Sequence, residues 1–96
     1  MKRDFADAQY KDWRNKVFKR DKFRCVCCGK RGWLNAHHLD SWDWFLMGRY
    51  EVSNGVTLCA GKNSCHNLFH NLYGRGKNTK YQFEEFKKIY GKKKGR

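Results

Sequence analysis

All four histidines of the chain lie in two short segments. Residues 36 to 39 read Ala-His-His-Leu, and residues 59 to 70 contain two histidines together with two cysteines. A Cys-x-x-Cys pair lies upstream, at Cys25 and Cys28, and Asn54 lies between the two histidine segments. Thiolates and imidazoles are the side chains that zinc and similar ions prefer. The order of these residues therefore indicates metal chemistry with two distinct sets of ligands.

The first set consists of thiols. Cys25, Cys28, Cys59 and Cys65 would make a four-thiolate zinc site, which has no open position and is therefore structural. The five residues between Cys59 and Cys65 make the second pair wider than the first, and Cys27 could replace either member of the first pair. The alternative is a set of reduced, buried thiols without a metal.

The length of the chain makes such a metal useful. We expect one domain over residues 1 to 96, and a domain of this size buries only about 60 to 65% of its unfolded surface. Small domains are commonly held by disulfides or by a metal. The five cysteines are an odd number, and the chain shows no signal peptide and no membrane-length apolar run. These features favour a metal and a cytoplasmic location over a secreted disulfide framework.

The histidines indicate a second, reactive site, although a histidine taken alone is more often a core or surface residue than a ligand. Neighbouring residues of a strand point to opposite faces, so His37 could bind an ion while His38 acts as a base on water. His66 and His70 are four residues apart and share one helix face, from which both can reach that ion. Phosphodiester hydrolysis requires both an ion that stabilises phosphate charge and a base that activates water.

The charge of the chain favours a polyanionic partner. The net charge is +13, with nine basic against four acidic residues in segment 1 to 24 and eight against two in segment 77 to 96. Nucleic acid is the commonest partner for such a charge. A basic surface kept for solubility is the alternative. Because aromatic residues are interleaved with the charge in both segments, only residues 92 to 96 are expected to form a flexible basic tail.

Apolar periodicity predicts three helices and two strands. A helix is expected over roughly residues 8 to 21, and the next two begin at the N-caps Ser64 and Thr79 and end near glycines 74 and 91. Apolar runs at residues 33 to 39 and 55 to 59 predict two strands joined by an irregular connection.

These motifs, taken in order, resemble those of the His-Asn-His (HNH) endonucleases, in particular the small phage and prophage members. The resemblance covers roughly residues 10 to 91 and implies an α+β domain with a ββα-metal core, the His-Me finger, a structural zinc site and flanking N- and C-terminal helices. It rests on Cys-x-x-Cys, Ala-His-His-Leu, Arg49-Tyr50, the run Asn-Gly-Val-Thr-Leu-Cys at residues 54 to 59, and Cys-His-x-x-Phe-His at residues 65 to 70.

The resemblance also implies roles for single residues. His37, His66 and His70 would bind a catalytic divalent ion, Mg²⁺ or Mn²⁺ first and other divalent ions as alternatives. His38 would be the general base, and Asn54 would fix the loop between the strands. The implied activity is hydrolysis of phosphodiester bonds in DNA, by nicking or by double-strand cleavage. The implied setting is a phage-encoded protein in the bacterial cytoplasm, with packaging proteins such as a terminase as candidate partners. The oligomeric state, monomer or weak dimer, stays open.

Two questions stay open, the role of Arg49 and the class of protein. Arg49 could hold the scissile phosphate or pair with Glu51 or Asp43. The rival to an enzyme is a non-catalytic zinc-ribbon module that binds nucleic acid, but such a module has no use for a second imidazole beside a ligand. A zinc-dependent nucleobase deaminase would need a His-x-Glu element, which the chain lacks.

Tryptophans 33, 42 and 44 are expected in the core rather than as platforms for bases, because a small domain uses its aromatic residues first for burial.

Overall fold

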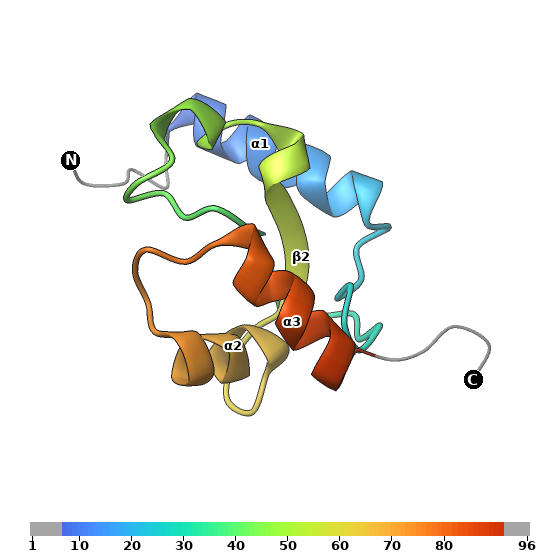
Figure 1. Cartoon of the computed structure of the whole chain (residues 1–96). Helices are drawn as coiled ribbons and strands as arrows, with labels where there is room; N and C mark the ends of the chain where they lie inside the picture. The colour runs from blue at the N-terminus through green and yellow to red at the C-terminus, as the bar shows by residue number, and fades with distance from the viewer. Residues whose placement is uncertain (1–6, 92–96) are drawn as a thin grey trace.

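The computed structural model describes residues 7 to 91, and the predicted tail at residues 92 to 96 lies outside them. Within the described range, an antiparallel pair of strands is packed with three helices, so the chain is a small mixed α and β structure (Figure 1). Every predicted element forms within about a residue of its expected bounds. The elements are α1 (Ala8–Arg20), β1 (Leu34–His38), β2 (Gly55–Cys59), α2 (Cys65–Tyr73) and α3 (Lys80–Tyr90).

Local sequence sets where the helices begin and end. Asp7, Ser64 and Thr79 precede the three helices, and the side chain of each accepts a hydrogen bond from a backbone N–H of the first turn. Gln82 completes a reciprocal capping box with Thr79. Helix α2 stops at Gly74, whose φ of 85° is a backbone conformation that glycine adopts without strain.

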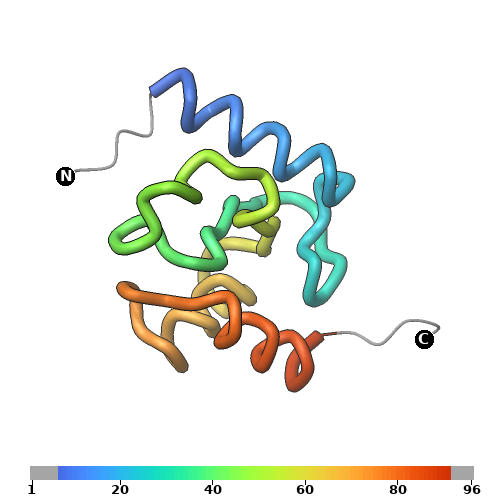
Figure 2. Tube along the Cα trace, turned by 45° about the horizontal axis from the view of Figure 1, so that its top comes forward, coloured from blue at the N-terminus to red at the C-terminus, as the bar shows by residue number. Residues whose placement is uncertain are grey.

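The sheet separates two helical layers. Helix α1 packs on one face of the strands and α2 on the other, and α3 lies against α2 (Figures 1 and 2). Gly55, the first residue of β2, lets α1 approach closely, because a Cβ there would lie 2.6 Å from the Trp13 ring. On the opposite face the Phe69 ring of α2 packs against Phe83 and Phe86 of α3.

Strand alternation places the two adjacent histidines in different layers. The register pairs His37 with Val56 and His38 with Gly55. The His38 ring stacks on Trp13 of α1, with ring centroids 4.0 Å apart, whereas the His37 ring lies 4.7 Å from the Phe69 ring of α2. The two imidazoles therefore point to opposite faces, as the strand pattern predicts.

Two of the three tryptophans predicted for the core lie at the surface. Trp42 is buried, but Trp33 is 73% exposed and Trp44 is 45% exposed, so the prediction is wrong for these two. Trp33 precedes β1, where the sheet ends, and its ring lies against the backbone of Gly61. Trp44 donates its indole N–H to the carbonyl of Asn78 (2.7 Å), which holds it at the rim of the core. A sheet of only two strands has too small an interior for every aromatic ring.

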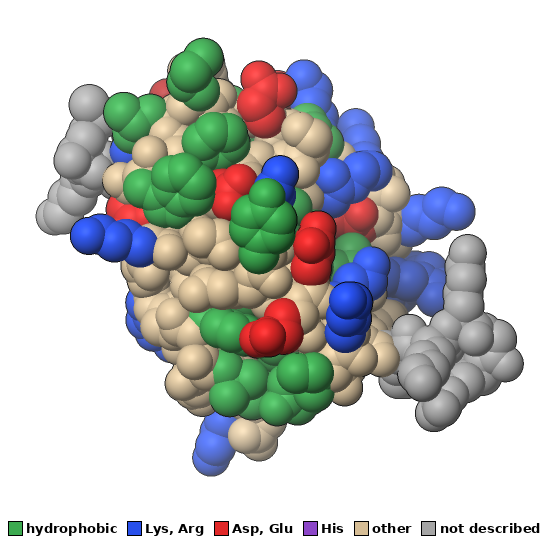
Figure 3. Space-filling view, in the orientation of Figure 1, with side chains coloured by type: hydrophobic (Ala, Val, Ile, Leu, Met, Phe, Trp, Pro, Cys, Tyr) green, Lys and Arg blue, Asp and Glu red, His purple; other side chains and the backbone are tan. Residues whose placement is uncertain are grey.

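The surface is basic on one side. Lys and Arg side chains crowd the side where α1 ends and where the segment with Cys25 and Cys28 lies (Figure 3). Apolar side chains also reach the surface, notably Leu46 and Met47 in a 3₁₀ turn of the connection between the strands. No helix in residues 7 to 91 combines the length and apolar character needed to cross a membrane.

Two candidate metal centres

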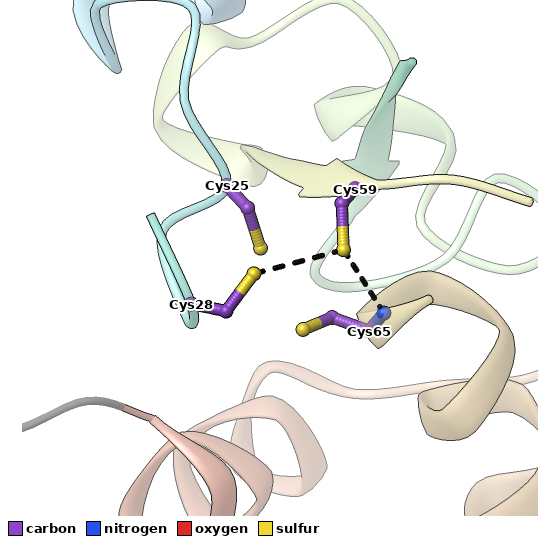
Figure 4. A group of neighbouring side chains, drawn as sticks. All are labelled: Cys25, Cys28, Cys59 and Cys65. Carbon is purple, nitrogen blue, oxygen red and sulfur yellow. Dashed lines mark hydrogen bonds between the residues drawn. The ribbon is translucent and has the colours of Figure 1, made fainter. Parts of the chain in front are cut away.

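The four thiols predicted as zinc ligands converge. Their Sγ atoms all lie within 4.8 Å of one another and point towards a common centre (Figure 4). The Sγ atoms of Cys28 and Cys59 are 3.8 Å apart, and tetrahedral zinc with Zn–S bonds of about 2.3 Å places its sulfur atoms about 3.8 Å apart. The cluster could therefore hold a metal ion such as zinc. Its members are Cys25 and Cys28 from the segment after α1, Cys59 from the end of β2, and Cys65 from the start of α2.

Backbone geometry explains how the wide second pair closes. Between Cys59 and Cys65 the chain turns through two residues with positive φ, Gly61 at 96° and Asn63 at 62°. This turn brings the Cys65 N–H to 3.2 Å from the Cys59 Sγ, to which it donates a hydrogen bond. In the first pair, Gly29 adopts a φ of 79° directly after Cys28. The longer spacing thus changes the turn without preventing the thiols from meeting.

The fifth cysteine lies beside the cluster but outside it. Cys27 is buried, and its hydrogen bond to Cys25 lowers the pKa of Cys25 to about 4 while raising the pKa of Cys27 itself. Burial raises the pKa of Cys28 and of Cys65. In the metal-free cluster these two thiols therefore keep protons that a bound metal would displace.

The second centre consists of three imidazoles. His37 of β1 and His66 and His70 of α2 each offer a ring nitrogen, and these nitrogens lie within 4.8 Å of one another. The Nε2 atoms of His66 and His70 are 3.1 Å apart. One helix and one strand thus supply three donors that could hold one ion. The remaining coordination positions would stay open for water or substrate, as in catalytic metal sites.

A cavity of about 270 Å³ adjoins the three imidazoles. Three consecutive residues of β1, Ala36, His37 and His38, line it, and no residue of β2 does, so it opens along the outer edge of β1. His66 and His70 line the same cavity. All four histidines therefore border one space, although His37 and His38 leave the strand on opposite faces.

Neighbouring groups orient the ligand rings. His70 Nδ1 lies 2.8 Å from the carbonyl oxygen of Gly74, which can only accept a hydrogen bond, so Nδ1 carries the proton. In the neutral ring, Nε2 then presents its lone pair beside His66 Nε2. The side-chain amide of Asn35 lies 3.2 Å from His66 Nδ1. The Gly74 carbonyl therefore fixes the tautomer of His70. Asn35 Nδ2, which is a donor, would instead place the proton of a neutral His66 ring on Nε2, so His66 can bind an ion through Nε2 only when this amide is turned to present its Oδ1 to Nδ1–H.

His38 is arranged as a proton acceptor. Its Nε2 lies 2.8 Å from the carbonyl oxygen of Arg49, so Nε2 is the protonated nitrogen and Nδ1 is the acceptor of the neutral ring. The ring is buried against Trp13 of α1 and also lines the cavity. The strand, α1 and the connection between the strands therefore all fix the direction of this imidazole.

Asn54 ties the two ends of the connection together. Its Oδ1 accepts the Asp40 N–H (2.9 Å), and its Nδ2 donates to the carbonyls of Asp40 (2.9 Å) and Gly48 (3.1 Å). Gly48 precedes Arg49, whose carbonyl binds His38. The buried amide of Asn54 therefore fixes the backbone directly before the Arg49 carbonyl that orients His38.

Arg49 lies against Trp42 rather than beside an acidic side chain. Arg49 donates from Nε to the Trp42 carbonyl (2.9 Å), and its guanidinium lies 4.3 Å from the centroid of the Trp42 ring. In residues 7 to 91 the ion pairs are Lys16–Asp12 and Arg20–Asp21, so Arg49 pairs with neither of the two acids considered for it. Its role with phosphate stays a prediction.

Arg75 is a site residue that sequence reasoning missed. It lines the cavity, and its guanidinium donates to the Asn67 Oδ1 of α2 (3.2 Å). Arg75 belongs to the loop between α2 and α3, where no periodic pattern or motif marks it. The one available signal is its position five residues after His70, just beyond the end of the helix that carries His66 and His70.

No protein-family model, no curated protein and no solved structure matches this chain. The functional interpretation therefore rests on the chemistry of the two centres.

Proposed function

We propose that this protein is a metal-dependent endonuclease of the HNH type, built on a ββα-metal core formed by β1, β2 and α2. The observation that carries the proposal is the second centre. Three imidazoles meet at one point beside a cavity, and a fourth, that of His38, borders the same cavity with Nδ1 as its acceptor nitrogen. A module that used zinc only for its fold would need the thiols but not this arrangement.

In the proposed mechanism each histidine has one task. His37, His66 and His70 would hold a divalent ion, Mg²⁺, Mn²⁺ or another, and this ion would supply charge stabilisation to the phosphate and the leaving oxygen. His38 takes a proton from the attacking water at Nδ1. Its Nε2–H stays on the Arg49 carbonyl, and this hydrogen bond becomes stronger as the ring gains charge. The products would carry 3′-hydroxyl and 5′-phosphate ends.

Basic residues support DNA as the substrate. The chain carries +13, and Arg75 places a guanidinium in the wall of the cavity. A guanidinium can bind two phosphate oxygens at once. We assign Arg75 to the scissile phosphate. Arg49 is the second candidate for this contact, because its guanidinium lies 4.3 Å from the centroid of the Trp42 ring and Trp42 lines the cavity.

Cleavage of supercoiled plasmid tests the proposal. The zinc-loaded protein is incubated with plasmid in the presence of Mg²⁺, Mn²⁺ or EDTA, alongside His38→Ala protein of equal zinc content. The parent should produce nicked and then linear plasmid with Mg²⁺ or Mn²⁺ but not with EDTA, and the variant should be strongly impaired. If both proteins bind the plasmid and neither cleaves it with any divalent ion, the non-catalytic binding module is the better description.

The dependence on protein concentration separates nicking from double-strand cleavage. Each chain contains one histidine centre, so a single encounter cuts one strand. Linear plasmid that appears without a nicked precursor would indicate two chains acting together. Accumulation of nicked plasmid at every concentration would indicate a monomeric nickase.

A further inference from the structure

The segments that carry the thiols contain cations and no carboxylate. Neither residues 22 to 39 nor residues 52 to 83 include a single Asp or Glu. The cations of these two segments that lie within three residues of a cysteine in the sequence are all exposed, and they are Lys22, Arg24, Lys30, Arg31 and Lys62. The zinc-cluster end of the molecule is therefore complementary to a polyanion, independently of the basic chain ends.

An exposed aromatic ring lies among these cations. Trp33 is 73% exposed, the most exposed aromatic side chain among the described residues. A Cβ on Gly61 would come within 2.9 Å of its ring, so the indole rests on the bare backbone of the turn between Cys59 and Cys65. The Trp33 carbonyl also accepts the Ala60 N–H (2.9 Å). Its position is thus fixed while most of its surface faces solvent.

The thiol cluster holds the cations and the ring together. Lys30 follows the first thiol pair, and its carbonyl accepts the Cys25 N–H (3.0 Å). Lys62 lies in the turn beneath Trp33, between the second pair of thiols. A metal bound by the four thiols would therefore order both segments at once.

We infer that this end of the protein, formed by Lys30, Arg31, Trp33 and Lys62, is a second nucleic-acid contact surface, on which Trp33 stacks with an unpaired base. The inference rests on the proposed function for the identity of the polymer. Single-stranded nucleic acid is recognised by aromatic rings that stack on bases beside cations that contact phosphates. An acidic protein segment would use the cations but would leave the flat ring without a specific role.

Strand geometry gives the distance between this surface and the catalytic histidines. Trp33 directly precedes β1, and His37 and His38 end it. At about 3.3 Å per residue, the strand separates Trp33 from these histidines by roughly 13 to 17 Å. Along duplex DNA, in which each strand rises about 3.4 Å per nucleotide, this length corresponds to about four or five nucleotides between the cleaved bond and the start of an overhang. The stacked base should therefore lie four or five nucleotides from the cleaved bond.

Binding by non-cleaving protein tests the inference. In a His38→Ala background, fluorescence anisotropy measures the Kd for labelled duplex DNA and for the same duplex with a single-stranded thymidine overhang. The overhang should tighten binding, and Trp33→Ala should weaken binding of the overhang substrate by at least about 5-fold, the lower end for stacking of one base. Trp33→Phe should retain most of the gain. The matched control is Tyr81→Ala, which removes a 69% exposed aromatic ring beside Lys80 on α3 and should leave the gain unchanged.

A charge variant covers the case in which Trp33→Ala disturbs the fold. Lys30, Arg31 and Lys62 changed together to Gln should lower the salt dependence of overhang binding by about 0.7 per lost phosphate contact. Zinc content and the thermal transition are measured for each variant. An unchanged Kd for Trp33→Ala, or an unchanged salt slope for the charge variant, overturns the inference. Neither result bears on the proposed function, which plasmid cleavage tests separately. Absence of all DNA binding by the parent would instead reject the proposed function.

Discussion

The thiol cluster and the histidine centre share α2, yet they are built differently. Cys65 and His66 are adjacent residues of this helix, and each belongs to a different centre. The Cys65 thiol faces three other thiols, and the Cys65 N–H donates to one of them. His66 faces a cavity that reaches the edge of β1. A one-residue step along the helix therefore separates a closed donor set, suited to stability, from an open one, suited to chemistry.

Separate substitutions of these two adjacent residues should give the largest difference, in zinc content and in thermal stability. Purified parent protein should contain about one tightly held zinc per chain, because binding by a small four-thiolate domain is coupled to folding. Cys65→Ser should lose both this zinc and the cooperative thermal transition, whereas His66→Ala should keep both. Metal analysis and thermal unfolding by circular dichroism measure the two properties. A stable, zinc-free Cys65→Ser protein would contradict the assignment of the cluster.

The next contrast lies between base and ligand at the strand end. His38→Ala should reduce the cleavage rate by roughly 10²- to 10⁴-fold, the usual contribution of a general base. Binding of Mn²⁺ and of DNA should persist, because this imidazole is not a member of the three-histidine set. Single-turnover cleavage at saturating Mn²⁺ measures the rate. Recovery of activity at higher Mn²⁺ would mean that His38 is a ligand instead.

Loss of a ligand should behave in the opposite way. His37→Ala and His70→Ala should raise the Mn²⁺ concentration needed for half-maximal cleavage, and excess Mn²⁺ should restore part of the activity. Each change removes one of three donors but leaves the other two in place on the strand or the helix. Titration of cleavage with Mn²⁺ gives this concentration for each variant. Parent-like titration curves for both variants would remove the histidine centre from catalysis.

The smallest effect on Mn²⁺ binding is expected for Asn35, which contacts a proposed ligand but does not itself bind the ion. Asn35→Ala removes the amide that lies 3.2 Å from His66 Nδ1. If this amide turns its Oδ1 to His66 Nδ1–H when the ion binds, its loss should weaken Mn²⁺ binding by about 10- to 100-fold, the usual cost of losing an outer partner. The control is Asn71→Ala, which changes an exposed residue of α2, the helix that carries His66. The same Mn²⁺ titration compares the two variants. Equal curves would show that the imidazole needs no support from Asn35.

Spacing along the sequence predicted the ligand sets, whereas tertiary packing decided the rest. A two-residue gap, a four-residue helical step and an adjacent pair on a strand each have a fixed geometry, so the cysteines and histidines could be grouped in advance. Arg75 had no such period, because its place in the cavity depends on how the loop between α2 and α3 folds back. The exposure of Trp33 likewise depends on where the sheet ends. Residues whose partners are distant in the chain are the ones that the pattern missed.

The contacts of His38 have a consequence for the order in which the proposed enzyme matures. Stacking on Trp13 and the carbonyl of Arg49 hold its ring, and neither contact uses a metal ligand. In the proposed enzyme the imidazole that would accept the proton is therefore already oriented in the folded chain, before a divalent ion binds the other three histidines. The proposed enzyme could therefore be stored in a folded but inactive form, and the concentration of the divalent ion would then control the onset of cleavage.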